Sequence, residues 1–137
     1  MITPDIKRFT AAQLDNDAYG QAVRELTAGQ KETHWMWYVF PQIVGLSTSA
    51  MGKRYGIVDL DEARRYMEHP LLGPRLVRTV ELVLALDKPL VDVLGKEVDA
   101  KKFVSCVTLF AAAVPGTDVF DRAVERFGRC YQTMALI

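Results

Sequence analysis

Apolar residues recur through most of this chain at the spacing of amphipathic helices. Between residues 16 and 28 they stand at positions i, i+3, i+4 and i+7, and Gly29 follows as a helix stop. Similar patterns, bounded by start and stop signals, predict further helices over residues 59–68, 74–84, 89–94, 99–113 and 119–127. We therefore expect a mainly helical protein.

Local signals at the ends of these segments support the same prediction. Asp59-x-x-Glu62 has the spacing of a capping box, in which the first side chain accepts a hydrogen bond from an amide at the helix start. Pro74 suits the first turn of one helix, and Asp99 could cap another. Gly128 is placed to end the last clear helix.

Residues 31–40, KETHWMWYVF, are ambiguous because their aromatic and β-branched content also permits a strand. Since the segments around them are helical, we expect a helix here too. On such a helix one arc, at positions i, i+3, i+4 and i+7, would carry Lys31, His34, Trp35 and Tyr38. The predicted fold is an all-α single compact domain over residues 1–137, with about six or seven helices.

Composition narrows the class of protein. The chain has 137 residues, half of them hydrophobic and a quarter charged, which excludes a disordered or collagen-like chain. Lys and Arg together number 17, as do Asp and Glu, so no positive excess marks a nucleic-acid or membrane surface. The longest apolar runs have six residues, whereas a bilayer-spanning helix needs about 20. We expect no nucleic-acid and no membrane partner.

The cysteines and the N-terminus bear on the compartment and on cofactors. Cys106 and Cys130 belong to no CxxC motif, and charged residues stand where a signal peptide needs an apolar stretch. We therefore expect reduced thiols in a cytoplasmic protein. The two histidines and two cysteines lie in four distant segments, so no metal site is expected. Without a GxGxxG or phosphate-loop motif, no cofactor is expected either.

Two segments carry the residues of a candidate ligand site. The arc on residues 31–38 offers an ammonium group, an imidazole and flat aromatic surfaces, and residues 45–59 are rich in glycine, hydroxyl groups and adjacent cations. Our first hypothesis is that the protein binds, and in one version also hydrolyses, an anionic aromatic or nucleotide-like small molecule. The residues that would frame the pocket are Lys31, His34, Trp35, Ser49, Arg54 and Tyr55.

Each of these residue types has a distinct role in such a pocket. Lys31 and Arg54 would hold the negative charge, the two aromatic rings would stack on the ligand, and His34 would donate or accept a proton. The plainer interpretation stays open, in which the aromatic residues belong to the core and residues 45–59 form a surface turn and short helix. The face of residues 99–113 that carries Ser105 and Thr108 is likewise typical of an ordinary amphipathic helix.

The second hypothesis is a non-enzymatic protein–protein interaction module. In that case the Trp and Tyr side chains would be anchors for a protein partner. Shape separates the two hypotheses, because a ligand site is concave whereas an interaction patch is flat and exposed.

Several strings in the chain resemble one known family, the domain-of-unknown-function 1810 family. The strings are Phe9-Thr-Ala-Ala-Gln13, Lys31-x-x-His34-Trp35-Met36-Trp37-x-x-Phe40-Pro41-Gln42, Gly45-Leu46-x-x-Ser49, Tyr55-Gly56-Ile57, Glu62-Ala63-x-x-Tyr66, His69-Pro70-x-Leu72-Gly73-x-Arg75-Leu76 and Asp99-x-x-Lys102-Phe-x-Ser105-x-x-Thr108-Leu109-Phe110. The resemblance implies a small bacterial-type protein with a mostly helical single domain. It implies no established reaction, cofactor or catalytic residue. Some members carry a calpastatin label, but calpastatin is a disordered inhibitor, whereas this composition is that of a packed globule.

The C-terminus departs from the family pattern. In the family the last long helix is usually followed by a turn rich in Gly and Asp and a short Thr-Leu segment. Here residues 129–134 are basic and bulky instead. The resemblance therefore does not predict how this tail packs.

Overall fold

The predicted helical segments are present, together with additional short helices. The computed structural model describes residues 5–137, and over this range it has ten α-helices, one 3-10 turn and no strand beyond a single bridge between Ile43 and Ile57. In chain order the helices are α1 (Lys7–Leu14), η1 (Asp15–Asp17), α2 (Ala18–Ala28), α3 (Met36–Val39), α4 (Ala50–Tyr55), α5 (Leu60–Glu68), α6 (Leu72–Leu84), α7 (Leu90–Leu94), α8 (Glu97–Ala113), α9 (Asp118–Phe127) and α10 (Tyr131–Leu136). The all-α prediction is confirmed. The helices outnumber the six or seven expected, because short ones such as α4 and α10 give almost no periodic signal.

Most of the predicted helix boundaries are confirmed. Gly29 ends α2 with φ at 87°, a left-handed conformation that favours glycine. The Asp59 carboxylate accepts a hydrogen bond of 2.8 Å from the Glu62 amide, as a capping box requires. Asp99 is an exception, because α8 begins two residues earlier, at Glu97. Asp99 is instead a buried residue of the first turn.

Residues 31–40 do not form the expected helix. Only Met36–Val39 is helical, and residues 30–35 form an irregular connection between α2 and α3. The backbone amides of this connection are held by distant partners: Lys31 donates to the Val93 carbonyl at 2.7 Å, and the next two amides donate to the Glu25 carboxylate at 2.6 and 2.8 Å. A local pattern of apolar residues contains no trace of these contacts.

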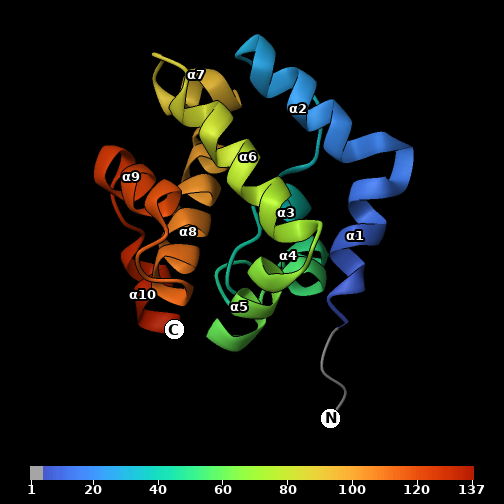
Figure 1. Ribbon diagram of the computed structural model, residues 1–137, viewed down its shortest axis with the longest axis vertical. Helices are drawn as coiled ribbons and strands as arrows, with labels where there is room; N and C mark the ends of the chain where they lie inside the picture. Colours follow the sequence, from blue (N-terminus) through green and yellow to red (C-terminus); the bar gives the residue numbers. More distant parts are fainter. Residues whose placement is uncertain (1–4) are drawn as a thin grey trace.

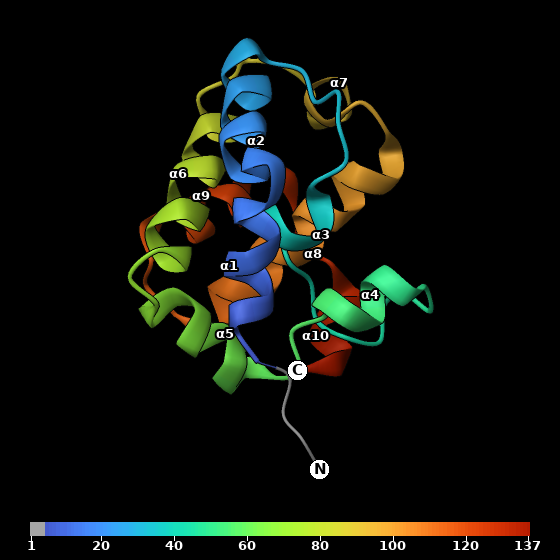
Figure 2. The ribbon, with the colours of Figure 1, turned by 90° about the vertical axis from the view of Figure 1, so that its right-hand side faces the viewer.

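Helix α8 lies at the centre of the fold. It packs against α3, α5, α7, α9 and α10, with α1 and α2 on one side of the molecule and α9 and α10 on the other (Figures 1 and 2). Aromatic contacts connect these layers, since Phe9 meets Tyr66, Tyr66 meets Phe110, and Phe110 stacks on Phe120. The buried hydrophobic residues form one core, and the chain is one helical domain.

A buried ion pair connects α1 to α5. The Arg8 guanidinium donates to both carboxylate oxygens of Glu62, at 3.0 and 2.9 Å, and the Glu62 side chain is fully buried. Arg8 also donates to the carbonyl oxygens of Arg54 and Gly56, at 2.9 and 2.8 Å. One side chain therefore fastens the N-terminal helix to both the end of α4 and the start of α5.

The turn between α5 and α6 requires a glycine at Gly73. A Cβ atom at this position would lie 2.1 Å from the carbonyl oxygen of Met67, a backbone atom that cannot move aside cheaply. The two helices approach each other this closely because the position has no side chain.

The C-terminal helix α10 covers the polar side of α8. The hydroxyl groups of Ser105 and Thr133 are 2.7 Å apart, and Thr108 accepts a hydrogen bond of 2.9 Å from the Cys130 amide. Ser105 and Thr108 are both buried as a result. Thr108 also donates to the Val104 carbonyl one turn earlier, as in an ordinary amphipathic helix.

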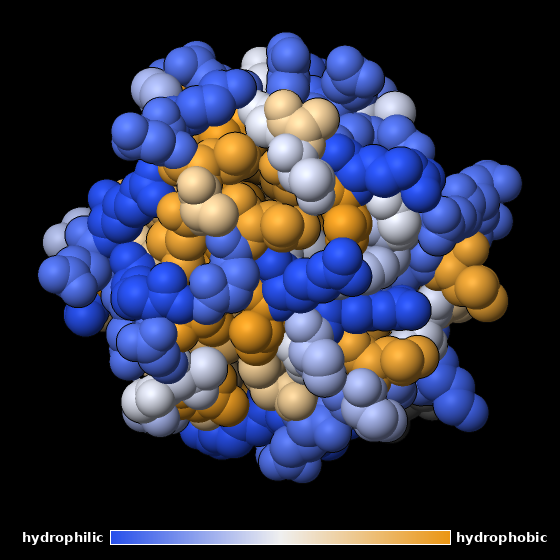
Figure 3. Space-filling model, turned by 45° about the horizontal axis from the view of Figure 1, so that its top comes forward, coloured by the Kyte–Doolittle hydropathy of each residue, from blue (hydrophilic) through white to orange (hydrophobic). Residues whose placement is uncertain are grey.

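Some hydrophobic residues reach the surface. On the face seen in Figure 3 they form an irregular patch bordered by charged and polar side chains. Both cysteines are free thiols, Cys106 in the core and Cys130 partly exposed. Within residues 5–137, none of the helices has the length and apolar character needed to cross a membrane.

Candidate functional site

The structure separates the four residues of the expected arc on residues 31–38. Trp35 is a core residue with an exposed fraction of 1%, whereas His34 is exposed. The Lys31 side chain is largely buried, and its ammonium group lies 3.1 Å from a carboxylate oxygen of Asp99. Tyr38 is half-buried, and its hydroxyl donates to the His34 carbonyl. For Trp35 the plainer interpretation, a core position, is the one that the structure shows.

Glu25 is the residue that holds this segment in place. Its carboxylate accepts hydrogen bonds from two backbone amides, from the Thr33 hydroxyl, from Gln21 and, at 3.0 Å, from the indole nitrogen of Trp35. Burial alone would raise the pKa of the Glu25 carboxyl, but the hydrogen bonds from Thr33, Glu32 and Gln21 outweigh burial and lower that pKa to about 2. The indole of Trp35 is thereby fixed in the core.

Stability is expected to depend on pH through Glu25. Its pKa is about 2 in the folded protein against an ordinary value of 4.5, so folding favours the ionised carboxylate. The stabilisation is complete above the unfolded pKa of 4.5 and is lost as the pH falls through the folded pKa of about 2. The whole effect is roughly 3 kcal/mol.

Urea unfolding at a series of pH values from neutral to strongly acidic measures this effect. The matched control is Glu25→Gln, which cannot ionise and should lose less free energy of unfolding over the same pH range. Equal losses in the two proteins would contradict the assignment of the shift to Glu25.

The other three predicted residues lie at the start and end of α4. Ser49 caps the helix by accepting a hydrogen bond of 3.1 Å from the Gly52 amide. At the other end the guanidinium of Arg54 is exposed and lies 5.3 Å from the ring centroid of Tyr55, which is buried against Phe9. Arg54 and Tyr55 line a shallow cavity beside α1, and Ser49 lines a different one. The six predicted residues do not share a cavity.

The cavity that contains Ser49 is the best candidate for a site. It has a volume of about 840 Å³ and lies between the loop before α4, the first half of α8 and the start of α10. We call it the Trp37 groove and define it by its aromatic, polar and cationic lining: Trp37, Gln42, Ser47, Thr48, Ser49, Lys101, Lys102 and Arg129. The strings that carry the family resemblance meet here, since the lining includes Trp37, Gln42, Leu46, Ser49, Lys102 and Ser105.

The groove has an excess of positive charge. Lys101, Lys102 and Arg129 line it, and none of the acidic residues in the described part of the chain does. Asp99 lies behind the lining, with its carboxylate oxygens 3.1 Å from the ammonium of Lys31 and 3.6 Å from that of Lys102. Two cations thus share one carboxylate, and this leaves one net positive charge before Lys101 and Arg129 are counted.

The aromatic part of the groove is Trp37. The ammonium group of Lys102 lies 3.8 Å from the centroid of its indole ring, a cation–π contact that fixes both side chains. Trp37 is half-buried, unlike Trp35 two residues earlier. An aromatic surface and ammonium groups therefore lie side by side at the groove.

Hydroxyl groups border the opposite wall. The Oγ atoms of Ser47 and Ser49 are 2.9 Å apart, and Ser47 also accepts a hydrogen bond of 3.2 Å from the Ser49 amide. Gly52 makes this arrangement possible, because a Cβ atom there would lie 2.6 Å from that of Ser47. The serines can donate hydrogen bonds to a ligand, but they lack a neighbouring base.

Neither histidine supplies such a base. His34 and His69 lie outside the lining of the Trp37 groove, and the Nδ1 atom of His69 accepts hydrogen bonds from two amides at the start of α6, at 3.1 and 3.3 Å. Burial raises the pKa of the Cys106 thiol, which makes it a poor nucleophile. No group of His, Cys, Asp and Glu in residues 5–137 could hold a metal ion. The groove is built to bind rather than to cleave.

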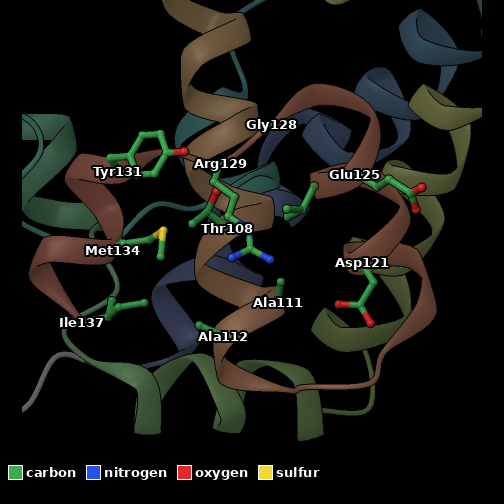
Figure 4. A pocket seen from close by; sticks show the side chains of 11 residues that line it. Thr108, Ala111, Ala112, Asp121, Glu125, Gly128, Arg129, Tyr131, Met134 and Ile137 are labelled. Atoms are coloured by element: carbon green, nitrogen blue, oxygen red, sulfur yellow. The ribbon is translucent and has the colours of Figure 1, made fainter.

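A second cavity of about 840 Å³ lies on the other side of α10. It is bordered by α8, α9 and α10, and we call it the α9–α10 groove (Figure 4). Its lining includes the acidic residues Asp121 and Glu125 of α9 and the apolar residues Tyr131, Met134 and Ile137. Arg129, between α9 and α10, lines both cavities.

Sequence reasoning identified Ser49 but missed most of the groove. The hydroxyl-rich loop was recognisable from its composition, and Trp37 stood in the aromatic string. Lys101, Lys102 and Arg129 come from segments at least 50 residues further along the chain. Only the fold brings these cations to Trp37, so no local signal could have found them.

Comparisons with known proteins place the chain in a family but give no activity. A family model described as "Protein of unknown function (DUF1810)" matches residues 3–136. A crystal structure of the conserved hypothetical protein Rv1873 from Mycobacterium tuberculosis is 40% identical in sequence and superposes with a TM-score of 0.91, over 98% of this chain and 96% of that one. A comparison with curated proteins gives no match.

Proposed function

The chain belongs to the DUF1810 family of proteins of unknown function, and from the geometry of the groove we propose that it binds an anionic aromatic, nucleotide-like small molecule in the Trp37 groove. The observation that carries this proposal is the lining itself. It combines three cations with an indole ring and contains no acidic residue among those described. Its volume of about 840 Å³ is in the range of small-molecule sites.

Charge supports an anionic ligand rather than a neutral one. Asp99 can balance only one of the two ammonium groups beside it, and Lys101 and Arg129 have no carboxylate partner in the described residues. A phosphate or carboxylate group would supply the missing negative charge. A hydrogen bond to such a charged group stabilises a complex by about 1.5–3 kcal/mol.

The aromatic part of the ligand is assigned to Trp37. Stacking of a base on an aromatic side chain contributes about 1–3 kcal/mol. The hydroxyl groups of Ser47 and Thr48 and the amide of Gln42 lie in the same groove and can accept or donate hydrogen bonds to the polar edge of a base. The groove thus offers a partner for each part of a nucleotide-like molecule.

Fluorescence titration of the intrinsic tryptophans with adenosine 5′-monophosphate tests the proposal. Adenosine and inorganic phosphate, titrated separately, should each bind more weakly than the nucleotide, because each makes only part of the contacts. Lys101→Ala should weaken nucleotide binding by roughly tenfold, since it removes one charged contact. Because Trp37→Ala removes a main reporter, its binding is measured by calorimetry, with a loss of about tenfold or more expected.

Arg54→Ala is the matched control for Lys101→Ala. It removes an exposed cation that the sequence placed in the pocket but that the structure places in a separate cavity beside α1. Its affinity for the nucleotide should equal that of the unchanged protein. Weaker binding by Arg54→Ala, with no effect of Lys101→Ala, would move the site to the Arg54 cavity and contradict the proposal.

A further inference from the structure

Helix α9 carries its opposite charges on different sides. Arg122 forms an ion pair with Glu81 of α6, and Arg126 donates to two carbonyl oxygens at and just after the end of α6, at 2.8 and 2.7 Å. Asp121 and Glu125 instead line the α9–α10 groove. Within residues 5–137 neither of these two carboxylates has a hydrogen bond or an ion pair. The groove therefore has one acidic wall whose charge is not balanced by α9 itself.

The opposite wall of the α9–α10 groove is apolar and exposed. Tyr131, Met134 and Ile137 point into the groove from α10, with exposed fractions of 77%, 41% and 39% (Figure 4). Such a concentration of exposed large apolar side chains is typical of a surface that another molecule covers. Tyrosine in particular is a frequent anchor of protein interfaces.

The floor of the groove is made of small residues. Ala111 and Ala112 of α8 lie between the two walls, so a backbone can approach α8 closely there. In Figure 4 the carboxylate of Asp121 is at the side of this floor, and that of Glu125 is turned outward along the rim. An acidic edge, a small floor and an apolar wall together match a segment with apolar residues on one side and cations beside them.

From this complementarity of charge and shape we propose that the α9–α10 groove is the docking site for a basic amphipathic helix of a partner protein. The apolar side of that helix would cover Tyr131, Met134 and Ile137, and its Lys or Arg residues would pair with Asp121 and Glu125. Helix-in-groove binding of this kind uses apolar anchors at spacings of three and four residues. This site is separate from the Trp37 groove and does not depend on the proposed ligand.

Arg129 gives the proposal a signature of its own. Figure 4 shows its guanidinium group over α8, between the two walls, and in the described residues it has no ion-pair partner. It lies where a cation of the partner helix would come, so it opposes a basic partner. Because Arg129 also lines the Trp37 groove, its removal should have opposite effects at the two sites: stronger binding of a basic peptide and weaker binding of a nucleotide.

Fluorescence anisotropy with a labelled helical Lys/Leu peptide, and with the same peptide carrying Glu in place of Lys, tests the docking site on the full chain. The Lys peptide should bind more tightly than the Glu peptide. Tyr131→Ser should weaken its binding about tenfold or more, and Asp121→Asn about threefold. Arg129→Gln should strengthen it about twofold to threefold. Asp92→Asn, an exposed carboxylate of α7 outside the groove, is the matched control and should have no effect.

Three results would overturn the proposal. The first is equal or tighter binding of the Glu peptide, and the second is weaker Lys-peptide binding by Arg129→Gln. The third is self-association of the chain without peptide that Tyr131→Ser abolishes, because a second copy would then be the occupant. Loss of nucleotide binding alone would refute the Trp37 groove and leave the docking site standing, so the two failures are distinguishable.

Discussion

Replacing Trp35 by alanine is expected to lower the free energy of unfolding by about 3–5 kcal/mol, the usual cost of removing a large buried aromatic residue. The indole ring has an exposed fraction of 1% and packs against Phe40. Its removal also leaves the Glu25 carboxylate without one of its buried donors, 3.0 Å away. Urea unfolding followed by circular dichroism measures the change.

Trp37→Ala is the matched control for this variant. It removes the same side chain two positions along, from a half-buried residue that lines a groove. Because less apolar surface is lost, its cost should be clearly smaller, on the order of 1–2 kcal/mol. Equal effects of the two substitutions would contradict the assignment of Trp35 to the core and of Trp37 to the groove.

The second large effect is expected at the buried ion pair between α1 and α5. Glu62→Ala should cost about 3–5 kcal/mol, because it leaves the Arg8 guanidinium buried without its carboxylate. The Glu62 side chain is fully buried, that of Arg8 has an exposed fraction of 11%, and Glu62 also accepts a hydrogen bond from the Val58 amide at 3.0 Å. Thermal and urea unfolding both measure the loss.

A double variant separates charge burial from lost packing. Arg8→Met combined with Glu62→Leu removes both charges and keeps most of the volume, so it should be more stable than Glu62→Ala alone. The exposed pair of Arg65 and Asp61 on α5 provides the comparison, and Asp61→Ala should cost less than about 1 kcal/mol. If the double variant were less stable than Glu62→Ala, the unpaired charge could not be the cause of the loss.

The parts of the fold that the sequence predicted depend on local contacts. The helix period, the glycine after α2 and the capping side chain of Asp59 all act within a few residues, so they are visible in the chain itself. The segment 31–40 was predicted wrongly because its conformation is set by Glu25 and Val93, which lie outside it. The first helix α1 was missed for a similar reason, since its place depends on Arg8 and a carboxylate 54 residues away.

The candidate site divides along the same line. Ser49 and its hydroxyl-rich loop were found from composition, whereas the choice between Trp35 and Trp37 was not. The helical arc favoured Trp35, but an irregular segment does not follow helical spacing, and the hydrogen bond to Glu25 draws Trp35 inward. Similarly, the polar side of α8 looked exposed, and only the fold shows that α10 covers Ser105 and Thr108 while leaving Lys101 at the groove.

The most direct test of the Trp37 groove is a titration of the isotope-labelled protein with adenosine 5′-monophosphate, followed by amide and indole resonances. The Trp37 indole and the amides of residues 47–49, 101–102 and 129 line or adjoin one groove, so they should shift together with a single affinity. The Trp35 indole should respond far less, because it is buried and bonded to Glu25. Shifts confined to Arg54 and Tyr55 or to the α9–α10 groove would contradict nucleotide binding in the Trp37 groove, as would no shifts with this nucleotide or with a wider set of aromatic anions.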